Sequence, residues 1–251
     1  MNRPAPTLQN SEPSLTTGQR SSPMSRNALL DKLPGHELDA LGPVLHPVKL
    51  RANERLIEKH QPIIHAVFLD EGWASVMSTG SMRPVEVAVV GAEGVVGACI
   101  LLGVAADTNN CIMQTDGRGR RVAASVLIQL LPQTPVLRSR MLFYIHQALL
   151  QSYNAVVATT FGSLEARVAR GILIHHDRSL GDEISITQDE LARKVGANRA
   201  GVTAVLHLLE GQQIIRSKRR CVLVVDRQRL EKAAAGTYAP VAALGHLRSD
   251  Q

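Results

Sequence analysis

Residues 186–210 read ITQDELARKVGANRAGVTAVLHLLE, and this stretch decides the fold. Thr187 and Glu190 have the spacing of a capping box, in which the threonine hydroxyl accepts an amide of the first helical turn and the glutamate reaches back to the amide of the cap. The pattern predicts a helix from here to Val195. Gly196 permits the left-handed turn that ends such a helix. The stretch therefore begins with a short helix that stops at a glycine.

A second helix follows the glycine turn. Asn198 is a favourable cap, and it predicts a helix from Arg199 to about Glu210. Apolar side chains at helical spacing form its inner face: Val202, Val205, Leu206 and Leu209. Small or polar side chains form the outer face behind Arg199: Ala200, Thr203, Ala204 and His207. Two short helices joined in this way, the second with a small outer face, are typical of a DNA-binding helix-turn-helix.

A basic turn follows the two helices. Residues 216–220 read RSKRR and lie between two apolar runs, 214–215 and 221–225. The pattern predicts a β-hairpin wing. Such a turn is by itself most often a solvated loop, but beside a recognition helix we expect its cations to neutralise DNA phosphates.

The positive charge of the chain is concentrated in its last quarter. The 251 residues carry 28 lysines and arginines against 22 aspartates and glutamates, a net charge of +6. Residues 1–184 contribute 17 basic and 16 acidic side chains, and residues 185–251 contribute 11 and 6. The surplus indicates a polyanion that meets the C-terminal module. Aromatic residues are only 3% of the chain, which argues against the base-stacking surfaces of single-strand binders.

Short β-rich runs separated by turn residues occupy the region from 44 to about 125. Their spacing of about ten residues is typical of a sandwich or barrel, and no helical stretch between them is long enough for a parallel α/β sheet. The expected strands are residues 44–50, 55–57, 63–69, 74–77, 85–90, 111–114 and 121–123. We expect a short helix over 27–41, interrupted at Pro34 and Gly35, to precede them.

Residues 91–97, GAEGVVG, have some of the glycine spacing of a nucleotide-binding loop. A dinucleotide fingerprint opens a long helix in a βαβ unit, and a phosphate loop ends in Gly-Lys-Ser/Thr; neither follows here. We interpret the glycines as a barrel corner, with a short helix that starts near Val95.

A long helix is predicted from Pro135, a favourable first helical residue, to about Thr160. The segment has no other proline and no glycine, and it would be roughly 39 Å long. Apolar or small residues recur on two stripes: Leu142, Ile145, Leu149, Ser152 and Val156, and Met141, Tyr144, Ala148 and Ala155. We expect one face to pack on the barrel and the other on a second chain; burial within one monomer is the alternative.

Ser163 is expected to cap the next helix, which runs to about His176. His175 and His176 lie near its C-terminal end, where the helix dipole favours positive charge, so we expect two solvated histidines. Adjacent helical positions point about 100° apart, so the pair is not expected to chelate a metal ion.

The remaining sequence indicates a cytoplasmic protein without a membrane segment. Cys99, Cys111 and Cys221 show no C-x-x-C spacing, which fits a reducing compartment and buried thiols. No apolar run approaches the roughly 20 residues of a membrane helix. Residues 1–25 are polar and are expected to form a disordered tail, with a basic targeting peptide as the alternative.

The sequence resembles the Crp/Fnr superfamily of bacterial transcription regulators from about residue 27 to 233. The resemblance rests on ITQDELA at 186–192 with Val195, Gly196 and Arg199, on EVAVVGAEGVVG at 86–97, and on VDRQRLE at 225–231. It implies an α+β fold: an N-terminal cyclic-nucleotide-binding-type β-barrel (jelly roll), a long dimerisation helix and a C-terminal winged helix-turn-helix. The implied boundaries are a tail at 1–25, the barrel at 26–134, the helix at 135–161, the DNA-binding domain at 162–235 and a tail at 236–251.

The resemblance implies a homodimer whose recognition helices enter successive major grooves, about 34 Å apart, of a near-palindromic operator in double-stranded DNA. RNA polymerase is the implied further partner. Arg199 matches the family's guanine-reading arginine. Ala200 and Ala204 depart from the family's acidic and basic residues, so its best-known half-site is not expected. The expected base-contacting residues are Arg199, Ala200, Gly201, Thr203 and Ala204. The expected phosphate-contacting residues are Thr187, Asn198, Lys218, Arg219 and Arg220.

The effector is not identified by the sequence. Cyclic-AMP-binding members place an arginine about ten residues after a Gly-Glu-Leu segment, and here residues 107–111 contain none, so cyclic AMP is not expected. A candidate effector pocket comprises Glu93, Gly94, Val95, Gly97, Asn109 and Asn110. No cofactor is expected; a haem on His60 or His65 is the disfavoured alternative, and the cysteine cluster of iron–sulfur sensors is missing from the N-terminal sequence.

Three functional classes follow. The leading hypothesis is a DNA-binding regulator without catalysis. The alternative is a small-molecule receptor, for a cyclic nucleotide or another anion, whose barrel ligand controls DNA binding. An enzyme is not expected, because the sequence has no His-Glu-x-x-His, no Gly-x-Ser-x-Gly and no paired carboxylates. Cys221, beside the basic wing, is a candidate for oxidation that would weaken DNA binding.

Overall fold

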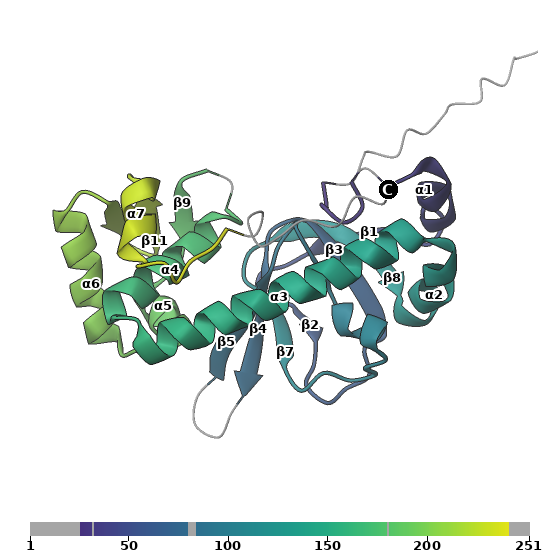
Figure 1. The fold of residues 1–251 in the computed structure, drawn as a ribbon, viewed down its shortest axis with the longest axis horizontal. Helices are drawn as coiled ribbons and strands as arrows, with labels where there is room; N and C mark the ends of the chain where they lie inside the picture. Colours follow the sequence, from purple (N-terminus) through teal and green to yellow (C-terminus); the bar gives the residue numbers. More distant parts are fainter. Residues whose placement is uncertain (1–25, 32, 80–83, 180, 241–251) are drawn as a thin grey trace, which may run out of the picture.

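Eight short strands of the N-terminal part pair into two antiparallel sheets in the computed structural model, which describes residues 26–31, 33–79, 84–179 and 181–240 (Figure 1). The tail expected at 1–25 and most of the one expected at 236–251 lie outside these ranges. The sheet orders are β1-β8-β3-β6 and β2-β7-β4-β5. The strands are β1 (His46–Leu50), β2 (Arg55–Ile57), β3 (His65–Glu71), β4 (Ala74–Thr79), β5 (Pro84–Val90), β6 (Val95–Val96), β7 (Asn110–Met113) and β8 (Gly117–Ala123). This jelly-roll arrangement confirms the predicted fold class, although the two sheets do not close into one continuous barrel.

The core of this sandwich lies between the sheets and under the helices. Phe68, Leu69, Met113 and Leu127 are completely buried. Four successive residues of β3, 66–69, are buried, since this strand has a neighbour on each edge and cover on both faces. Burying a large apolar side chain contributes about 1.5–3 kcal/mol, so this cluster is the main source of the sandwich's stability.

Residues 91–102 differ from the prediction. Val95 and Val96 do not start a helix; they form β6, which pairs with Val67 and Phe68 of β3. The short 3-10 helix η1 (Ala98–Leu102) begins only after Gly97, whose φ of 87° lies in the left-handed region. Two valines are β-branched and suit a strand, and the turn to the helix needs the glycine. The interpretation as a corner was therefore right and the helix start wrong.

The helices of the N-terminal part also differ in extent from the prediction. The helix expected over 27–41 is helical only as α1 (Gly35–Leu41), whereas residues 28–31 form a turn. Asn27 is completely buried and accounts for that turn, because its side chain accepts the amide of Leu29 and donates to the carbonyls of Leu69 and Gly94. The helix α2 (Ala124–Leu130) and the short 3-10 helix η2 (Leu131–Gln133) were not predicted.

The helix α3 (Pro135–Phe161) begins at the predicted proline and runs along most of the molecule (Figure 1). Its first amides are met by a buried carboxylate of α1: Glu37 accepts from Val136 N at 2.7 Å and from Leu137 N at 2.9 Å. One side packs on the sandwich, with Leu137 and Met141 fully buried. The opposite side is open and carries exposed apolar side chains: Leu142, Leu149, Tyr153, Val156 and Val157.

A small α/β unit forms the C-terminal part. It comprises α4 (Leu164–His176), β9 (Glu183–Ser185), α5 (Gln188–Lys194), α6 (Arg199–Gly211), β10 (Ile215–Lys218), β11 (Cys221–Val224) and α7 (Arg227–Ala233). Ser163 caps α4 by accepting from Ala166 N, as predicted. The predicted hairpin β10–β11 is present, and β9, which was not predicted, joins it in a sheet of order β10-β11-β9.

A buried polar cluster joins the two parts of the molecule. Glu86 of β5 contacts Lys194 of α5 and the hydroxyl of Ser75, and its Oε1 lies 3.3 Å from His175 Nε2. Lys194 Nζ lies 4.8 Å from the centre of the Trp73 ring, which also meets the His175 ring edge-on. Burial alone would raise the pKa of Glu86, but His175 and Lys194 outweigh it and lower this pKa to about 2.

The cluster corrects the prediction for the two histidines. His175 is only 1% exposed, and its Nδ1 lies 2.6 Å from the carbonyl of Gly171, so it is a packed residue of the contact between the two parts. His176 is half-buried, contacts Arg227 and lies 3.3 Å from Asp182. Neither is a solvated helix-end histidine, because the surface that covers them belongs to distant segments.

A second buried ion pair lies beside the cluster. Arg178, which follows α4, donates to Glu93 at 2.6–2.8 Å, and the arginine side chain is 2% exposed. Glu93 belongs to the turn between β5 and β6. Two charged contacts therefore tie the C-terminal unit to β5 and to the turn that follows it.

Candidate nucleic-acid interface

The local signals of residues 187–201 produce a helix-turn-helix. Thr187 Oγ1 accepts from Glu190 N at 3.1 Å, and Glu190 accepts from Thr187 N at 2.7 Å, so the capping box is complete. Burial raises the pKa of Glu190, but the two hydrogen bonds from Thr187 outweigh it and hold this pKa below its usual value. Gly196 has a φ of 65°, and Asn198 Oδ1 accepts from Gly201 N at 2.7 Å. These predictions are confirmed.

The helix α6 buries one face and exposes the other. The four predicted inner residues, Val202, Val205, Leu206 and Leu209, are all buried. Arg199, Ala200 and Ala204 are exposed, and Thr203 is half-buried. Gly201 faces α4, because a Cβ added there would lie 2.8 Å from a methyl of Leu164. Of the five residues expected to contact bases, four lie on the open side of α6 and Gly201 lies at its edge.

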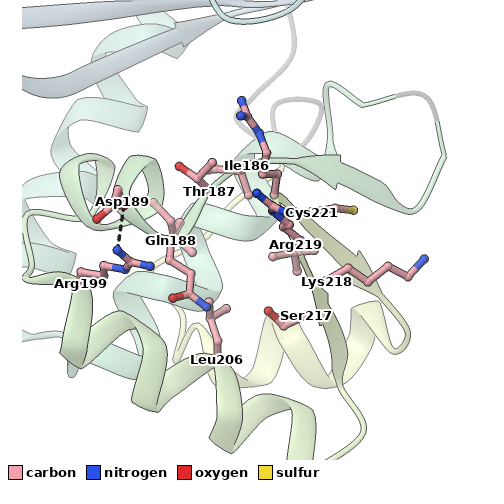
Figure 2. Close-up of a pocket in the computed structure, with 13 residues that line it drawn as sticks. Ile186, Thr187, Gln188, Asp189, Arg199, Leu206, Ser217, Lys218, Arg219 and Cys221 are labelled. Carbon is pink, nitrogen blue, oxygen red and sulfur yellow. Dashed lines mark ion pairs between the residues drawn. The ribbon is translucent and has the colours of Figure 1, made fainter.

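A groove separates α6 and the start of α5 from the wing (Figure 2). It is lined by Thr187, Gln188, Asp189, Arg199, Leu206, Ser217, Lys218, Arg219 and Arg220, among others. The structure thus brings Arg199 and Thr187 together with the three cations expected to contact phosphates. Asn198 lies at the N-terminus of α6, exposed.

The turn of the wing hairpin is shorter than predicted. Residues 216–218 belong to β10, and the turn consists of Arg219 and Arg220 alone, the latter with a φ of 61°. Both are exposed, as is Lys218, whose Nζ lies 3.6 Å from a Glu183 carboxylate oxygen. A two-residue turn with positive φ suits the twist of a tight hairpin, so the basic side chains stand at its end.

Two residues of the groove were missed by the sequence reasoning. Gln188 Oε1 accepts the Thr203 hydroxyl at 2.7 Å, and Asp189 Oδ2 lies 3.4 Å from the Arg199 guanidinium. Both lie in the first turn of α5, directly after the Thr187 cap. The capping box placed them on that turn, but only the crossing of the two helices shows that they reach α6.

Cys221 does not have the environment of a reactive thiol. Burial, together with the hydrogen bond to Glu183 at 2.9 Å and the charge of that carboxylate, raises the pKa of the Cys221 thiol to about 11. Cys221 and Cys99 are partly exposed rather than buried, and Cys111 is buried as expected. The basic residues nearby do not lower the pKa of this thiol below its usual value, because the nearest charged partner of the sulfur is the carboxylate of Glu183.

A pocket of about 200 Å³ lies between the sandwich and α3. Of the candidate effector residues, Val95, Gly97 and Asn109 line it. The other three are engaged elsewhere: Glu93 pairs with Arg178, the Gly94 carbonyl accepts from Asn27, and Asn110 Oδ1 accepts from Lys59 N at 3.0 Å. The lining residues are mostly apolar, with Cys99, Cys111, Asp107, Asn109 and Tyr144 as the polar ones, and lysine and arginine do not occur among those described.

Within the described ranges, no group of three or more histidine, cysteine, aspartate or glutamate residues is placed to hold a metal ion. Over the same residues, no helix has both the length and the apolar character needed to cross a membrane.

Residues 166–233 match the family model of the Crp-like helix-turn-helix domain. A search of curated proteins gives no match. Among solved structures, FixK2 from Bradyrhizobium japonicum is similar with a TM-score of 0.66 and 17% identity, over 76% of this chain and 97% of that one. A Crp/Fnr-family transcriptional regulator from Thermus thermophilus gives 0.61 and 21%, over 76% and 100%. CLP from Xanthomonas campestris, a c-di-GMP responsive global regulator, gives 0.61 and 18%, over 75% and 97%.

The family match and the shared architecture define a transcription regulator with a DNA-binding helix-turn-helix. Residues 166–233 therefore belong to the Crp-like helix-turn-helix domain family, and the solved structures show that the chain shares the fold of Crp/Fnr-family regulators.

Proposed function

We propose that this protein binds a near-palindromic operator in double-stranded DNA as a homodimer, through α6, and that it regulates transcription without catalysis. The observation that supports this most directly is the groove that faces solvent between α6 and the wing. Arg199, with 65% of its side chain exposed, stands at one side of it, and the cations of the wing stand at the other. An exposed arginine at the tip of a recognition helix suits guanine, whose O6 and N7 accept two hydrogen bonds.

The homodimer is supported by the open side of α3. Leu142, Leu149 and Val156 recur at intervals of seven residues and are 41%, 46% and 64% exposed. Spacing of this kind places side chains on one seam of a coiled coil. A second copy of α3 would cover this seam and would give the two α6 helices the two-fold symmetry of an operator.

We also propose a cellular location and a further partner for the protein. A regulator of transcription meets its operator in the cytoplasm of a bacterial cell, and RNA polymerase is the proposed partner at the promoter.

Selection from a random double-stranded DNA library tests the function. The full-length protein should enrich a near-palindromic site with half-sites one helical turn apart. Arg199→Ala should weaken binding to that site by about 1–3 kcal/mol and should relax the preference for one guanine in each half-site. Arg51→Ala, an exposed arginine of the sandwich, is the matched control. An unchanged affinity of Arg199→Ala for the enriched site would refute the role of Arg199.

A ligand-controlled receptor is the second candidate, favoured by the pocket between the sandwich and α3. Its lining offers thiols, one carboxylate and one amide but, in the described residues, no cation to meet a phosphate. Thermal unfolding in the presence of cyclic nucleotides checks this. A rise of several degrees would favour the receptor for a cyclic nucleotide, and no rise would agree with a pocket that takes a different ligand or none.

A further inference from the structure

Two side chains at the start of α5 reach across to the open side of α6. The Thr203 hydroxyl lies 2.7 Å from Gln188 Oε1 and 2.9 Å from the carbonyl oxygen of Arg199, so its one proton is shared between these two acceptors, and the Arg199 guanidinium pairs with Asp189. Arg199 and Thr203 are four residues apart, one turn of α6, so two successive residues of α5 contact two successive turns of α6. The capping box fixes the first turn of α5 and thereby the direction of both side chains.

The end of the Gln188 side chain lies in the groove itself. Figure 2 shows it extending from α5 towards α6 and ending between Arg199 and Ser217, above Leu206. A glutamine amide has one acceptor oxygen and two N–H donors. Since the oxygen accepts from Thr203, the donor end of the amide is turned away from Thr203 and into the groove.

We infer that Gln188 is a further specificity-determining residue, which donates to an acceptor on a base edge beside the guanine read by Arg199, and that Thr203 positions it. The inference rests on the proposed function of α6. Guanine O6 and N7, adenine N7 and thymine O4 are the major-groove acceptors that such an amide recognises. Thr203, expected to contact bases itself, then acts through Gln188.

Asp189 supports a base rather than a phosphate as the target of Gln188. Its carboxylate is 53% exposed beside Arg199 and places a negative charge directly next to Gln188 on the same turn. That charge opposes a phosphate, whereas a base edge is neutral. The cations that suit phosphates lie on the far side of the groove, in the wing.

The test compares the sites that full-length variants select from a random double-stranded DNA library. Gln188→Ala should bind the wild-type site about tenfold more weakly and should lose the preference at one base pair in each half-site. The guanine preference that depends on Arg199 should persist in this variant. Gln212→Ala, an exposed glutamine at the other end of α6, should select the wild-type site.

Two variants of Thr203 separate positioning from packing. Thr203→Val keeps the shape of the side chain but removes the hydroxyl, and it should weaken the base preference at the same position of the half-site as Gln188→Ala. Thr203→Ser keeps the hydroxyl and should retain the wild-type preference.

Two results would overturn the inference. One is a Gln188→Ala variant that selects the wild-type site with wild-type affinity. The other is a uniform loss of affinity for all sequences with a shallower salt dependence, which would mark Gln188 as a phosphate contact. Either result leaves the proposed function intact, whereas a wild-type protein that enriches no site at all would refute the proposed function.

Discussion

Cys221 lies beside the cations of the wing, yet its sulfur donates to the carboxylate of Glu183. With a pKa raised to about 11, the thiolate is on the order of one part in 10⁴ at neutral pH. We therefore expect iodoacetamide to modify Cys221 in the folded protein at least about a hundredfold more slowly than an ordinary cysteine. Mass spectrometry of the peptide that contains Cys221, with urea-unfolded protein as the reference, measures this rate.

Glu183→Gln gives the matching control. Removing the carboxylate removes one cause of the raised pKa, so alkylation of Cys221 should become faster in this variant. Equal rates in the folded and unfolded protein would contradict the assignment and would restore Cys221 as a candidate for oxidation.

Single residues were predictable where their partners are close in the sequence. The caps Ser163, Thr187 and Asn198 bond to amides three residues away, and all three were predicted. His175 was not, because the residues that bury it, Trp73 and Glu86, are about a hundred positions distant. The helix dipole favours solvated cations at exposed helix ends, and the end of α4 at His175 is buried.

At the scale of elements, α3 depends on a cap from another helix. Pro135 has no amide hydrogen, and the next two amides are bonded by the buried carboxylate of Glu37. Glu37→Gln removes the negative charge that favours this helix N-terminus and leaves one amide without its acceptor, so we expect a loss of about 1–2 kcal/mol in the free energy of unfolding. Urea unfolding followed by circular dichroism measures it.

Asp39→Asn, an exposed acid on the same helix α1, should change this free energy by less than about 0.5 kcal/mol. A Glu37→Gln variant as stable as the wild type would mean that the cap contributes nothing to α3.

The salt dependence of DNA binding should distinguish phosphate contacts of the wing from base contacts of α6. Lys218→Gln and Arg219→Gln each remove a cation from an exposed position beside the groove. If both contact phosphates, each substitution should weaken binding to operator and unrelated DNA alike and should lower the slope of log affinity against log salt by about 0.9. Titrations from low to moderate salt measure the slope, with Lys49→Gln on β1 as control. An unchanged slope would remove the wing from the interface.

Helices and strands were predictable where the hydrophobic period or the capping residues lie within or directly beside the element. The strands of the sandwich, α3, α5 and α6 were found within a few residues. The two-residue strand β6, the helix α2 and the strand β9 were missed, because each is too short to show a period. Only pairing with a distant neighbour, β3 for β6 and β11 for β9, makes the two strands stable.

At the scale of the whole molecule, the contact between the sandwich and the C-terminal unit was not predictable. The sequence marks Glu86 and Lys194 only as an acid and a base more than a hundred residues apart. In the structure both side chains are about nine-tenths buried or more and in contact. The orientation of α6 relative to α3, and hence to a second copy, depends on contacts of this kind, which no local pattern reveals.

Glu86→Gln should weaken this contact. The substitution leaves the Lys194 ammonium buried without its counter-charge, which costs about 3–5 kcal/mol for a buried pair. Unfolding followed by the fluorescence of Trp73, the only tryptophan of the chain and a neighbour of Lys194, reports on it directly. Replacing both partners, Glu86→Leu with Lys194→Met, should recover most of the loss, since no charge is then left unpaired. Glu58→Gln, an exposed acid of the sandwich, should have little effect.

The depressed pKa of Glu86 sets the pH range of this contribution. A carboxylate whose folded pKa of about 2 lies below its ordinary value of 4.5 stabilises the protein above that value, and the contribution is lost as the pH falls from about 4.5 towards 2. The difference in unfolding free energy between the wild type and Glu86→Gln should therefore stay constant from pH 7 down to about 5 and shrink below about 4.5. Groups that do not interact with Glu86 titrate alike in both proteins and cancel in the difference. A difference that already shrinks between pH 7 and 5 would show that Glu86 is not held ionised by His175 and Lys194, and that the two parts of the molecule are joined by something other than this charge.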